Sequence, residues 1–298
     1  MSLAKRAATT LKQVRASGPL VQCVTNYVSM DIMANVLIAA KMSPAMAHGG
    51  VCGEAAEFAK IASGVNLNLG TLDEDWAIGA KASAMVCKDM KKPWVLDPVG
   101  FGALSYRTGV IKELIEMGPT VLKGNASEII TCAKLTYPED FAVMPATIVP
   151  DGEATEAKGV DSTICSDTVN TKLLDAFAKK FGGVVCMTGK YDYVTDGASE
   201  KYWVKHSVPM LQDFTASGCA LGAIITGFCA TGSQMEPAQS HACSTAQAVA
   251  YYTLTGKRTM EDPSYSRGPG SFRQGFLDTL RNLTEDEVEQ LSKIEKVE

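Results

Sequence analysis

The sequence predicts an α/β protein with a mostly parallel central sheet and helices on both of its faces. Short apolar, β-like runs alternate with helical patterns along most of the chain, and this alternation is typical of parallel sheets. No linker or sharp change in composition interrupts it, which favours one domain over residues 1–298. With 46% hydrophobic and 20% charged residues, the chain has enough apolar material for a sizeable core.

The predicted strands are short and bounded by turn-forming residues, whereas the predicted helices carry apolar residues at helical spacing. Ser29 is a candidate N-cap for the first of these helices. A hairpin is expected to turn at Asp196-Gly197, between antiparallel strands at 191–194 and 201–205. The other strands are predicted at 21–25, 43–48, 65–69, 94–97, 120–123 and 183–188. Helices are predicted at 30–40, 54–62, 74–88, 109–117, 126–133 and 168–180, followed by three more up to about residue 280.

Two segments have a weaker pattern. Residues 135–165 are irregular, which indicates a loop-rich insertion. The acidic, amphipathic tail 284–298 is expected to be a peripheral, solvated helix or a frayed end.

Charge and composition exclude several classes of partner. The net charge is −5 and there is no run of lysines or arginines, which argues against nucleic acid as a partner. No apolar stretch approaches the ~20 residues that a membrane-spanning helix needs. The nine cysteines form no C-x-x-C pair and are irregularly spaced, so a reduced protein without a disulfide framework or a zinc site is expected. A cytoplasmic location follows, although the basic, acid-free start leaves a mitochondrial address open.

Three common catalytic motifs are missing from the sequence. There is no G-x-x-x-x-G-K-[ST], no G-x-G-x-x-G after the first strand and no G-x-S-x-G. A P-loop ATPase, a Rossmann dehydrogenase and an α/β-hydrolase therefore lose support.

The topology rule for open α/β sheets selects the loops to inspect, because ligands bind outside the carboxyl ends of the strands. His48 and His241 are candidate acid–base groups without a recognisable partner in the sequence. The selected loops begin with Asn26, His48, Gly70, Asp97, Lys123 and Thr188.

Residues Thr215 to Cys219, Thr-Ala-Ser-Gly-Cys, lead into a long apolar helix. Small residues let a ligand approach the backbone, so several N–H groups at the helix start could hold one anionic group, such as a phosphoryl group in transfer. The alternative is a glycine-containing helix start that packs tightly under a neighbour.

Two strand ends carry charged groups. Asp97, followed by Pro98, could approach a metal–phosphate complex or simply start a turn. In Lys123-Gly-Asn-Ala-Ser-Glu128, the lysine could neutralise a phosphate and the carboxylate could hold Mg²⁺. Asn125 and Glu128 equally fit a helix capping box.

Taken together, these segments resemble the hydroxyethylthiazole kinase family of the ribokinase-like superfamily, and the resemblance covers residues from about 20 to 280. Each stretch alone is weak, but their order along the chain is specific. The matching stretches are Gln22-Cys-Val-Thr-Asn26, Ser43-Pro-Ala-Met46, Asn68-Leu-Gly-Thr71, Trp94-Val-Leu-Asp-Pro-Val99, Lys123-Gly-Asn-Ala-Ser-Glu128, Tyr193-Val-Thr-Asp-Gly197 and Ala216-Ser-Gly-Cys219.

The resemblance implies that ATP phosphorylates the hydroxyl of 4-methyl-5-(2-hydroxyethyl)thiazole, for thiamine synthesis or salvage. It also implies Mg²⁺, and a homotrimer with active sites at subunit interfaces. Carried over by position, it assigns the thiazole pocket to Asn26, Val28, Met46, Gly70 and Ala216, ATP contacts to Lys123, Thr188 and Asn125, the metal to Asp97 and Glu128, and the anion hole to Ser217, Gly218 and Cys219.

Two residues depart from the pattern of bacterial members of this family. Lys123 stands where those members usually have arginine, so the charge is kept without the bidentate fork. Ala216 stands where they usually have glycine, so this position cannot need a conformation open only to glycine. Both changes are similar to those of plant members.

Cys219 stands where many ribokinase-like kinases have an aspartate base. A thiol with a pKa near ~8.5 is mostly protonated at neutral pH; a helix N-terminus lowers that pKa and nearby phosphates oppose the lowering. Because a loose phosphoryl-transfer transition state needs little early proton removal, Cys219 is expected to orient the hydroxyl rather than deprotonate it at the outset.

Three alternatives remain at this point. A hydroxymethylpyrimidine kinase would share the architecture but have a different pocket around Met46. An ATP-dependent dehydratase of the same superfamily would have a carboxylate at position 219. A non-catalytic thiazole or nucleotide sensor would be expected to lack Asp97, Glu128 or Gly218, all of which are present.

Overall fold

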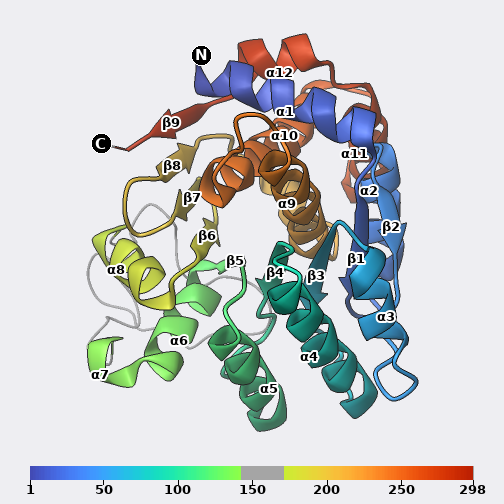
Figure 1. The fold of residues 1–298 in the computed structure, drawn as a ribbon. Helices are drawn as coiled ribbons and strands as arrows, with labels where there is room; N and C mark the ends of the chain where they lie inside the picture. Colours follow the sequence, from blue (N-terminus) through green and yellow to red (C-terminus); the bar gives the residue numbers. More distant parts are fainter. Residues whose placement is uncertain (142–170, 298) are drawn as a thin grey trace.

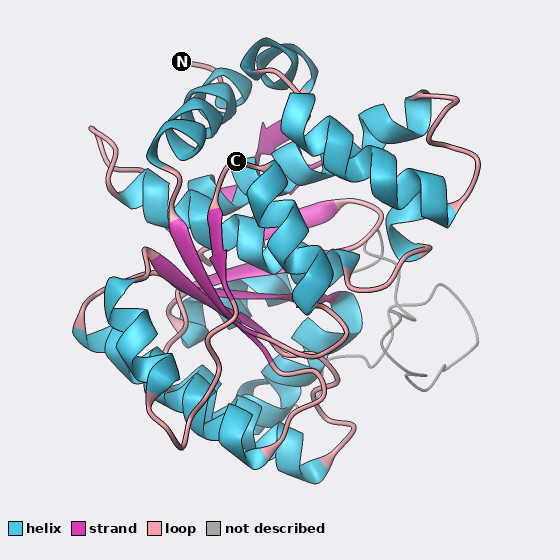
Figure 2. Ribbon diagram, turned by 90° about the vertical axis from the view of Figure 1, so that its right-hand side faces the viewer, coloured by secondary structure: helices cyan, strands magenta, loops and turns pink. Residues whose placement is uncertain are grey.

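The computed structural model describes residues 1–141 and 171–297, in which a central sheet lies between two layers of helices (Figure 2). The sheet of this described part has nine strands in the order β2-β1-β3-β4-β5-β6-β7-β8-β9. The strands are β1 (Leu20–Val24), β2 (Ser43–Ala45), β3 (Gly64–Asn68), β4 (Trp94–Asp97), β5 (Val121–Asn125), β6 (Val184–Thr188), β7 (Asp192–Thr195), β8 (Lys201–Val204) and β9 (Ile294–Lys296).

The helices follow the strands in alternation through most of the chain (Figure 1). A short 3₁₀ helix, η2 (Pro209–Gln212), precedes α9. The α-helices are α1 (Leu3–Ser17), α2 (Met30–Ala39), α3 (Glu54–Ile61), α4 (Glu74–Asp89), α5 (Ser105–Glu116), α6 (Ala126–Thr136), α7 (Pro138–Phe141), α8 (Thr171–Phe181), α9 (Ser217–Ser233), α10 (His241–Glu261), α11 (Pro269–Asn282) and α12 (Glu285–Leu291).

The predicted parallel sheet is confirmed for its first six strands, because every pairing from β2 through β6 is parallel. The predicted hairpin is also confirmed: β7 and β8 pair antiparallel with Tyr193 opposite Trp203. The strand order reverses direction between β1 and β3, and such a switch point opens a crevice at the carboxyl ends of the two strands.

The two faces of the sheet are covered by different helices (Figure 1). One core contains residues of α1, α2 and α9 to α12, and the other contains residues of α3 to α6 and α8. Strand β3 shows the alternation directly, because Val65 and Leu67 lie in the second core while Asn66 and Asn68 face the other way.

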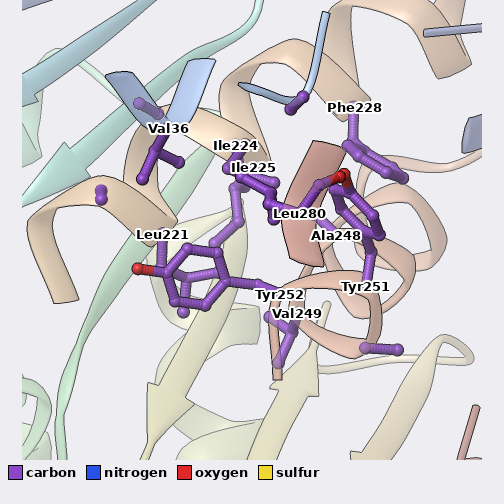
Figure 3. Packing of buried hydrophobic residues seen from close by; sticks show 14 of the residues in the cluster. Val36, Leu221, Ile224, Ile225, Phe228, Ala248, Val249, Tyr251, Tyr252 and Leu280 are labelled. Carbon is purple, nitrogen blue, oxygen red and sulfur yellow. The ribbon is translucent and has the colours of Figure 1, made fainter. Parts of the chain in front are cut away.

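Helix α9 is the buried centre of the first core. Its residues from Ala220 to Gly232 are all buried, as expected for a helix that is apolar on every side. Figure 3 shows Leu221 and Phe228 of α9 packed beside Tyr252 and Tyr251 of α10.

Several local expectations need correction. The N-terminal helix α1 was not expected, α5 starts at Ser105 rather than residue 109, and β2 stops at Ala45 rather than residue 48. Ser29 makes no side-chain cap, since its backbone is already in the right-handed helical region. The Asn26 Oδ1 atom accepts from the N–H groups of Val28 and Ser29 instead, at 3.0 and 3.1 Å.

The irregular segment 135–165 is described only as far as Phe141, and the rest of it lies outside the described residues. In the described part, no helix combines the length and the apolar character needed to cross a membrane.

The tail 284–298 was expected to be either a solvated helix or a frayed end. It forms helix α12 and strand β9, and both pack against the rest of the protein. Strand β9 extends the sheet, with Trp203 of β8 opposite Glu295. Val288 of α12 is 0% exposed and belongs to the first core. The Arg15 guanidinium of α1 donates to the Leu283 carbonyl at 2.7 Å, which ties the two ends of the chain together.

The buried tail predicts a stability effect. Val288→Ala should lower the free energy of unfolding by about 2 kcal/mol, because two buried methyl groups are lost. Urea denaturation would measure the change. Leu291→Ala is the matched control on the same helix, since Leu291 is 40% exposed and should cost far less. Equal, negligible effects would mean that the tail does not pack in solution.

Candidate active site

The residues predicted for the site lie at the carboxyl ends of the parallel strands. Asn26 follows β1, Gly70 follows β3, and Asp97 and Thr188 end β4 and β6. The N-terminus of α9 reaches the same edge, because a Cβ atom on Gly218 would lie 3.4 Å from the Lys123 Nζ atom of β5. The fold therefore brings the loop before α9 to the charged strand ends.

A relay of side-chain amides links the first strands. The Asn26 Nδ2 atom donates to Asn68 Oδ1 at 2.7 Å, and the Asn68 Nδ2 atom donates to Asp97 Oδ2 at 2.9 Å. The Gly70 N–H also donates to Asn68 Oδ1, at 3.2 Å. Because a carboxylate can only accept, Asp97 fixes the orientation of both amides.

Asn68 was not assigned a role from the sequence, although it is the central member of this relay. The signal was present: asparagine is disfavoured in strands, yet Asn66 and Asn68 occupy alternate positions of a fully buried strand. Two such residues on one face of a strand indicate a polar layer at that face.

A buried ion pair joins β4 to β5. The Lys123 ammonium lies 3.0 Å from Asp97 Oδ2, and the two side chains are 5% and 2% exposed. Burial acts to lower the pKa of Lys123. The nearby negative groups, chiefly Asp97, have the larger effect, so the pKa of Lys123 is raised overall. Burial raises the pKa of Asp97, opposed by Lys123 and Asn68. With direct contact and a second hydrogen-bond donor, the charged pair is the favoured form.

Glu128 belongs to a capping box at the start of α6. Its Oε2 atom accepts from the Asn125 N–H, and Asn125 Oδ1 accepts from the Glu128 N–H, both at 2.9 Å. The capping interpretation of this segment is thus confirmed. Burial, and then the Asp97 carboxylate, raise the pKa of Glu128 to about 7, opposed by Lys123 and by the Asn125 and Gly100 backbone.

The donor set of Asp97 and Glu128 fits Mg²⁺. The two carboxylates repel each other closely enough to raise the pKa of Glu128, and a divalent cation would relieve that repulsion. A carboxylate has about four acceptor positions, so the cap leaves Glu128 with acceptor capacity. Mg²⁺ in nucleotide sites usually has one or two carboxylates, the rest being water and phosphate oxygens.

Thr188 lies beside Asn125 in the pairing of β5 with β6. The Thr188 hydroxyl donates to the Gly124 carbonyl at 3.3 Å. Lys123, Asn125 and Thr188 are therefore held on adjacent strand ends.

The loop before α9 has an unusual backbone. Ala216 is in the left-handed region at φ 64°, and α9 has no side-chain cap at its N-terminus. An alanine tolerates this region at a cost that a glycine would avoid, so the sequence argument that glycine is not obligatory stands, although the conformation does favour it. The Tyr252 hydroxyl donates to the Ser217 carbonyl at 2.8 Å and anchors the loop from below.

Cys219 lies just inside this helix start. Burial, and then Asp97, raise the pKa of its thiol to about 12, although Lys123 and a hydrogen bond with Asn68 act to lower it. The thiol is therefore protonated at neutral pH, and it can donate or accept a hydrogen bond without carrying charge.

The remaining predicted residues lie less centrally. Val28 is 55% exposed beside the Asn26 cap, and Met46 is partly buried against the first core. His48 stacks on Trp76 with ring centroids 4.3 Å apart. His241 lines a hollow of about 500 Å³ that also contacts Pro119 and Gly183, at the amino ends of β5 and β6.

The strand order and the arrangement of helices on both faces of the sheet place the chain in the class of ribokinase-like folds. Solved structures agree on the fold. A pyridoxal kinase from Staphylococcus aureus in complex with ADP aligns with a TM-score of 0.55, covering 79% of this chain and 86% of that chain at 13% identity. A ribokinase-like superfamily protein from Enterococcus faecalis aligns at 0.54, covering 93% and 89% at 12% identity.

Within that class, the chain belongs to the hydroxyethylthiazole kinase family, whose sequence model matches residues 11–139 and 147–286. A hydroxyethylthiazole kinase of Zea mays is 39% identical over 95% of this chain and 90% of its own length. One from Cereibacter sphaeroides is 37% identical over 96% and 97%. The solved hydroxyethylthiazole kinase protein of Pyrococcus horikoshii has a TM-score of 0.80 at 30% identity, covering 99% and 100%.

The left-handed alanine predicts a stabilising substitution. Ala216→Gly should raise the free energy of unfolding by about 0.5 kcal/mol, because the relief of backbone strain slightly exceeds the entropy lost by the more flexible glycine. Chemical denaturation would measure it. Ala230→Gly, in the right-handed interior of the same helix, should instead lose at least about 1 kcal/mol. A similar loss in both variants would contradict a strained Ala216.

Proposed function

We propose that this protein transfers the γ-phosphoryl group of ATP to the hydroxyl of 4-methyl-5-(2-hydroxyethyl)thiazole, giving the thiazole phosphate for thiamine synthesis or salvage. The observation that carries the proposal is the approach of Lys123 to the uncapped start of α9 at Gly218, in a chain of this family. A buried cation and free backbone amides meet there, as a phosphoryl group in transfer requires.

Lys123, Thr188 and Asn125 are the proposed nucleotide contacts. Lys123 supplies the positive charge, and its pairing with Asp97 keeps that charge in place before ATP arrives. Thr188 and Asn125 present polar side chains on the neighbouring strand ends. A lysine contacts phosphate as a point charge rather than as a planar fork.

Asp97 and Glu128 are the proposed holders of Mg²⁺. When bound with ATP, the metal would neutralise charge on the phosphates. The protein's own part is to hold Asp97 at the end of β4, fixed by Asn68 and Lys123, and Glu128 in the first turn of α6, fixed by the capping box.

The thiazole pocket is proposed at the switch point between β1 and β3, with Asn26, Val28, Met46, Gly70 and Ala216 as its walls. Gly70 permits the close approach of Asn26, because a Cβ atom on Gly70 would lie 2.6 Å from Asn26 Nδ2.

In the transfer step, the substrate hydroxyl oxygen forms the new bond to phosphorus while the bond to the β-phosphate oxygen breaks and ADP leaves. The amides of Ser217, Gly218 and Cys219 are proposed to hold the moving group. The protonated Cys219 thiol orients the hydroxyl. The hydroxyl proton passes late to a phosphate oxygen or to water, once the attacking oxygen has become acidic.

We further propose that residues 1–298 form one kinase domain that assembles as a homotrimer in the cytoplasm. Tyr27 is 70% exposed and Val28 is 55% exposed beside the proposed pocket, and a neighbouring subunit would cover them. The eight cysteines of the described segments are free thiols, as a reducing compartment would keep them. A stable, active monomer in sedimentation would overturn the trimer.

The deciding experiment is an ADP-release assay with Mg-ATP that compares hydroxyethylthiazole with hydroxymethylpyrimidine. Turnover that depends on the thiazole is expected. Turnover with the pyrimidine alone would overturn the pocket assignment, and thiazole binding without turnover would favour a sensor.

The protonated thiol predicts a moderate role for Cys219. Cys219→Ala should lower kcat by only about 10- to 100-fold, at or below the lower limit of the roughly 10²- to 10⁴-fold range for losing one acid–base group. Steady-state kinetics with ADP binding as a check of folding would measure it. Cys229→Ala, at a buried thiol farther along α9, is the matched control and should keep kcat. Complete loss of turnover in a folded Cys219 variant would show that the thiol is indispensable.

The raised pKa of Glu128 leads us to expect that kcat/KM for Mg-ATP depends on pH. Because its pKa is raised to about 7, kcat/KM for Mg-ATP should rise with pH and level off above about pH 7, as the carboxylate becomes ionised. The contribution of Glu128 to folding stability has the opposite pH dependence. Because its pKa is higher in the folded protein than in the unfolded chain, this contribution falls as pH rises from about 4.5 to 7.

Glu128→Gln should lower kcat/KM and remove its rise near pH 7. Burial also raises the pKa of Asp192 to about 7, so Asp192→Asn is the control for this titration. If the rise disappears in Asp192→Asn and persists in Glu128→Gln, the assignment of Glu128 is wrong.

A further inference from the structure

Helix α9 lies along strand β3 with small residues at each point of contact, below the proposed site. Successive inward positions of the strand meet successive turns of the helix, because two strand residues and about one helical turn have similar lengths. The pairs are Gly64 with Thr226, Asn66 with Gly222, and Asn68 with Cys219.

The contacts of Gly64 with Thr226 and of Asn66 with Gly222 leave no space for an additional methyl group. A Cβ atom on Gly64 would lie 2.9 Å from Thr226 Cγ2, and a Cβ atom on Gly222 would lie 2.7 Å from Asn66 Nδ2. Real Cβ atoms do not approach heavy atoms this closely. The backbone of α9 is therefore seated on the sheet at a depth that glycine at 222 alone permits.

Asn66 fills this space without a hydrogen bond to the helix. Its side chain is 0% exposed, and neither its Oδ1 nor its Nδ2 atom has a partner among the described residues. A buried amide without partners lowers stability, so the benefit of Asn66 to the fold does not lie in bonding. Asn66 instead acts through its size and shape, which limit how closely α9 can approach the sheet at Gly222.

The opposite side of α9 is closed as well. Leu221, Ile225 and Phe228 pack against α10 and its surroundings (Figure 3), and the Tyr252 hydroxyl holds the Ser217 carbonyl. Because the interior is closely packed, a methyl group added between α9 and β3 cannot be absorbed by a free outward movement. It must displace or tilt the first turns of the helix.

We infer that Asn66 and Gly222 are positioning residues for the transfer reaction: they set the depth of α9, and thereby place Cys219 and the amides of its first turn over Asn68 and Lys123. The inference rests on the proposed function. Gly222 lies one turn after Cys219, so a shift at Gly222 reaches the helix start directly, and a displacement near 1 Å at a reacting group can cost about 100-fold in rate.

The test is a compensating pair of substitutions. Gly222→Ala should lower kcat by about 10- to 100-fold, while the Kd for ADP, measured by calorimetry, changes by less than about threefold, because Lys123 and Thr188 do not move with α9. Asn66→Ala makes room for the added methyl group. The double variant Gly222→Ala/Asn66→Ala should therefore recover most of the lost kcat.

The matched control is Gly109→Ala in α5, where an added Cβ atom would meet no heavy atom within 4 Å. It brings the same gain in helix propensity as Gly222→Ala without a steric clash, and kcat should be kept.

Full kcat in Gly222→Ala would overturn the inference, as would a folded double variant that stays as slow as the single one. If Gly222→Ala does not fold, the double variant decides alone, since it must both fold and turn over. Wild-type turnover is measured first: its absence while ADP still binds would reject the proposed function itself, and the inference with it.

Discussion

A lysine and an aspartate are buried together where β4 and β5 end, and neither charge could be kept there without the other. Removing a charge from water is costly unless a partner and further hydrogen bonds compensate it. Lys123 and the Asn68 amide both contact the same oxygen of Asp97. Asn68 in turn orients Asn26, whose Oδ1 atom accepts from the Val28 and Ser29 N–H groups just before α2. One ion pair thus fixes the geometry of four neighbouring strands, β1, β3, β4 and β5.

The buried ion pair must be covered by another element, and in the proposed function this element must also leave room for substrate. Helix α9 meets both demands because it is apolar along its length but begins with residues that have almost no side chain. The long apolar part is held between the sheet and α10, as Figure 3 shows. The start is then free to present backbone N–H groups, and Gly218 lies close to the lysine that it helps to cover.

Strands and helices that depend on the local pattern of apolar residues could be predicted from the sequence. Strands β1 to β8 and most helices follow from alternation and helical spacing. Asn26, Asp97, Lys123 and Thr188 lie at the carboxyl ends of parallel strands, where the topology rule expects them. Long-range contacts were missed. The partner of β9 lies about 90 residues earlier in the chain, the role of Asn68 depends on two other strands, and the left-handed Ala216 gives no signal in its own side chain.

Cys219 shows how burial decides the chemistry open to a residue. At an exposed helix N-terminus, the helix dipole would lower the thiol pKa. Here the thiol is enclosed beside Asp97, and these two influences raise its pKa to about 12. A group that stays neutral cannot act as an early base, but it can hold a hydroxyl without repelling the phosphates of ATP. A site built this way depends on placing its groups accurately, and rigid packing beneath α9 provides that accuracy.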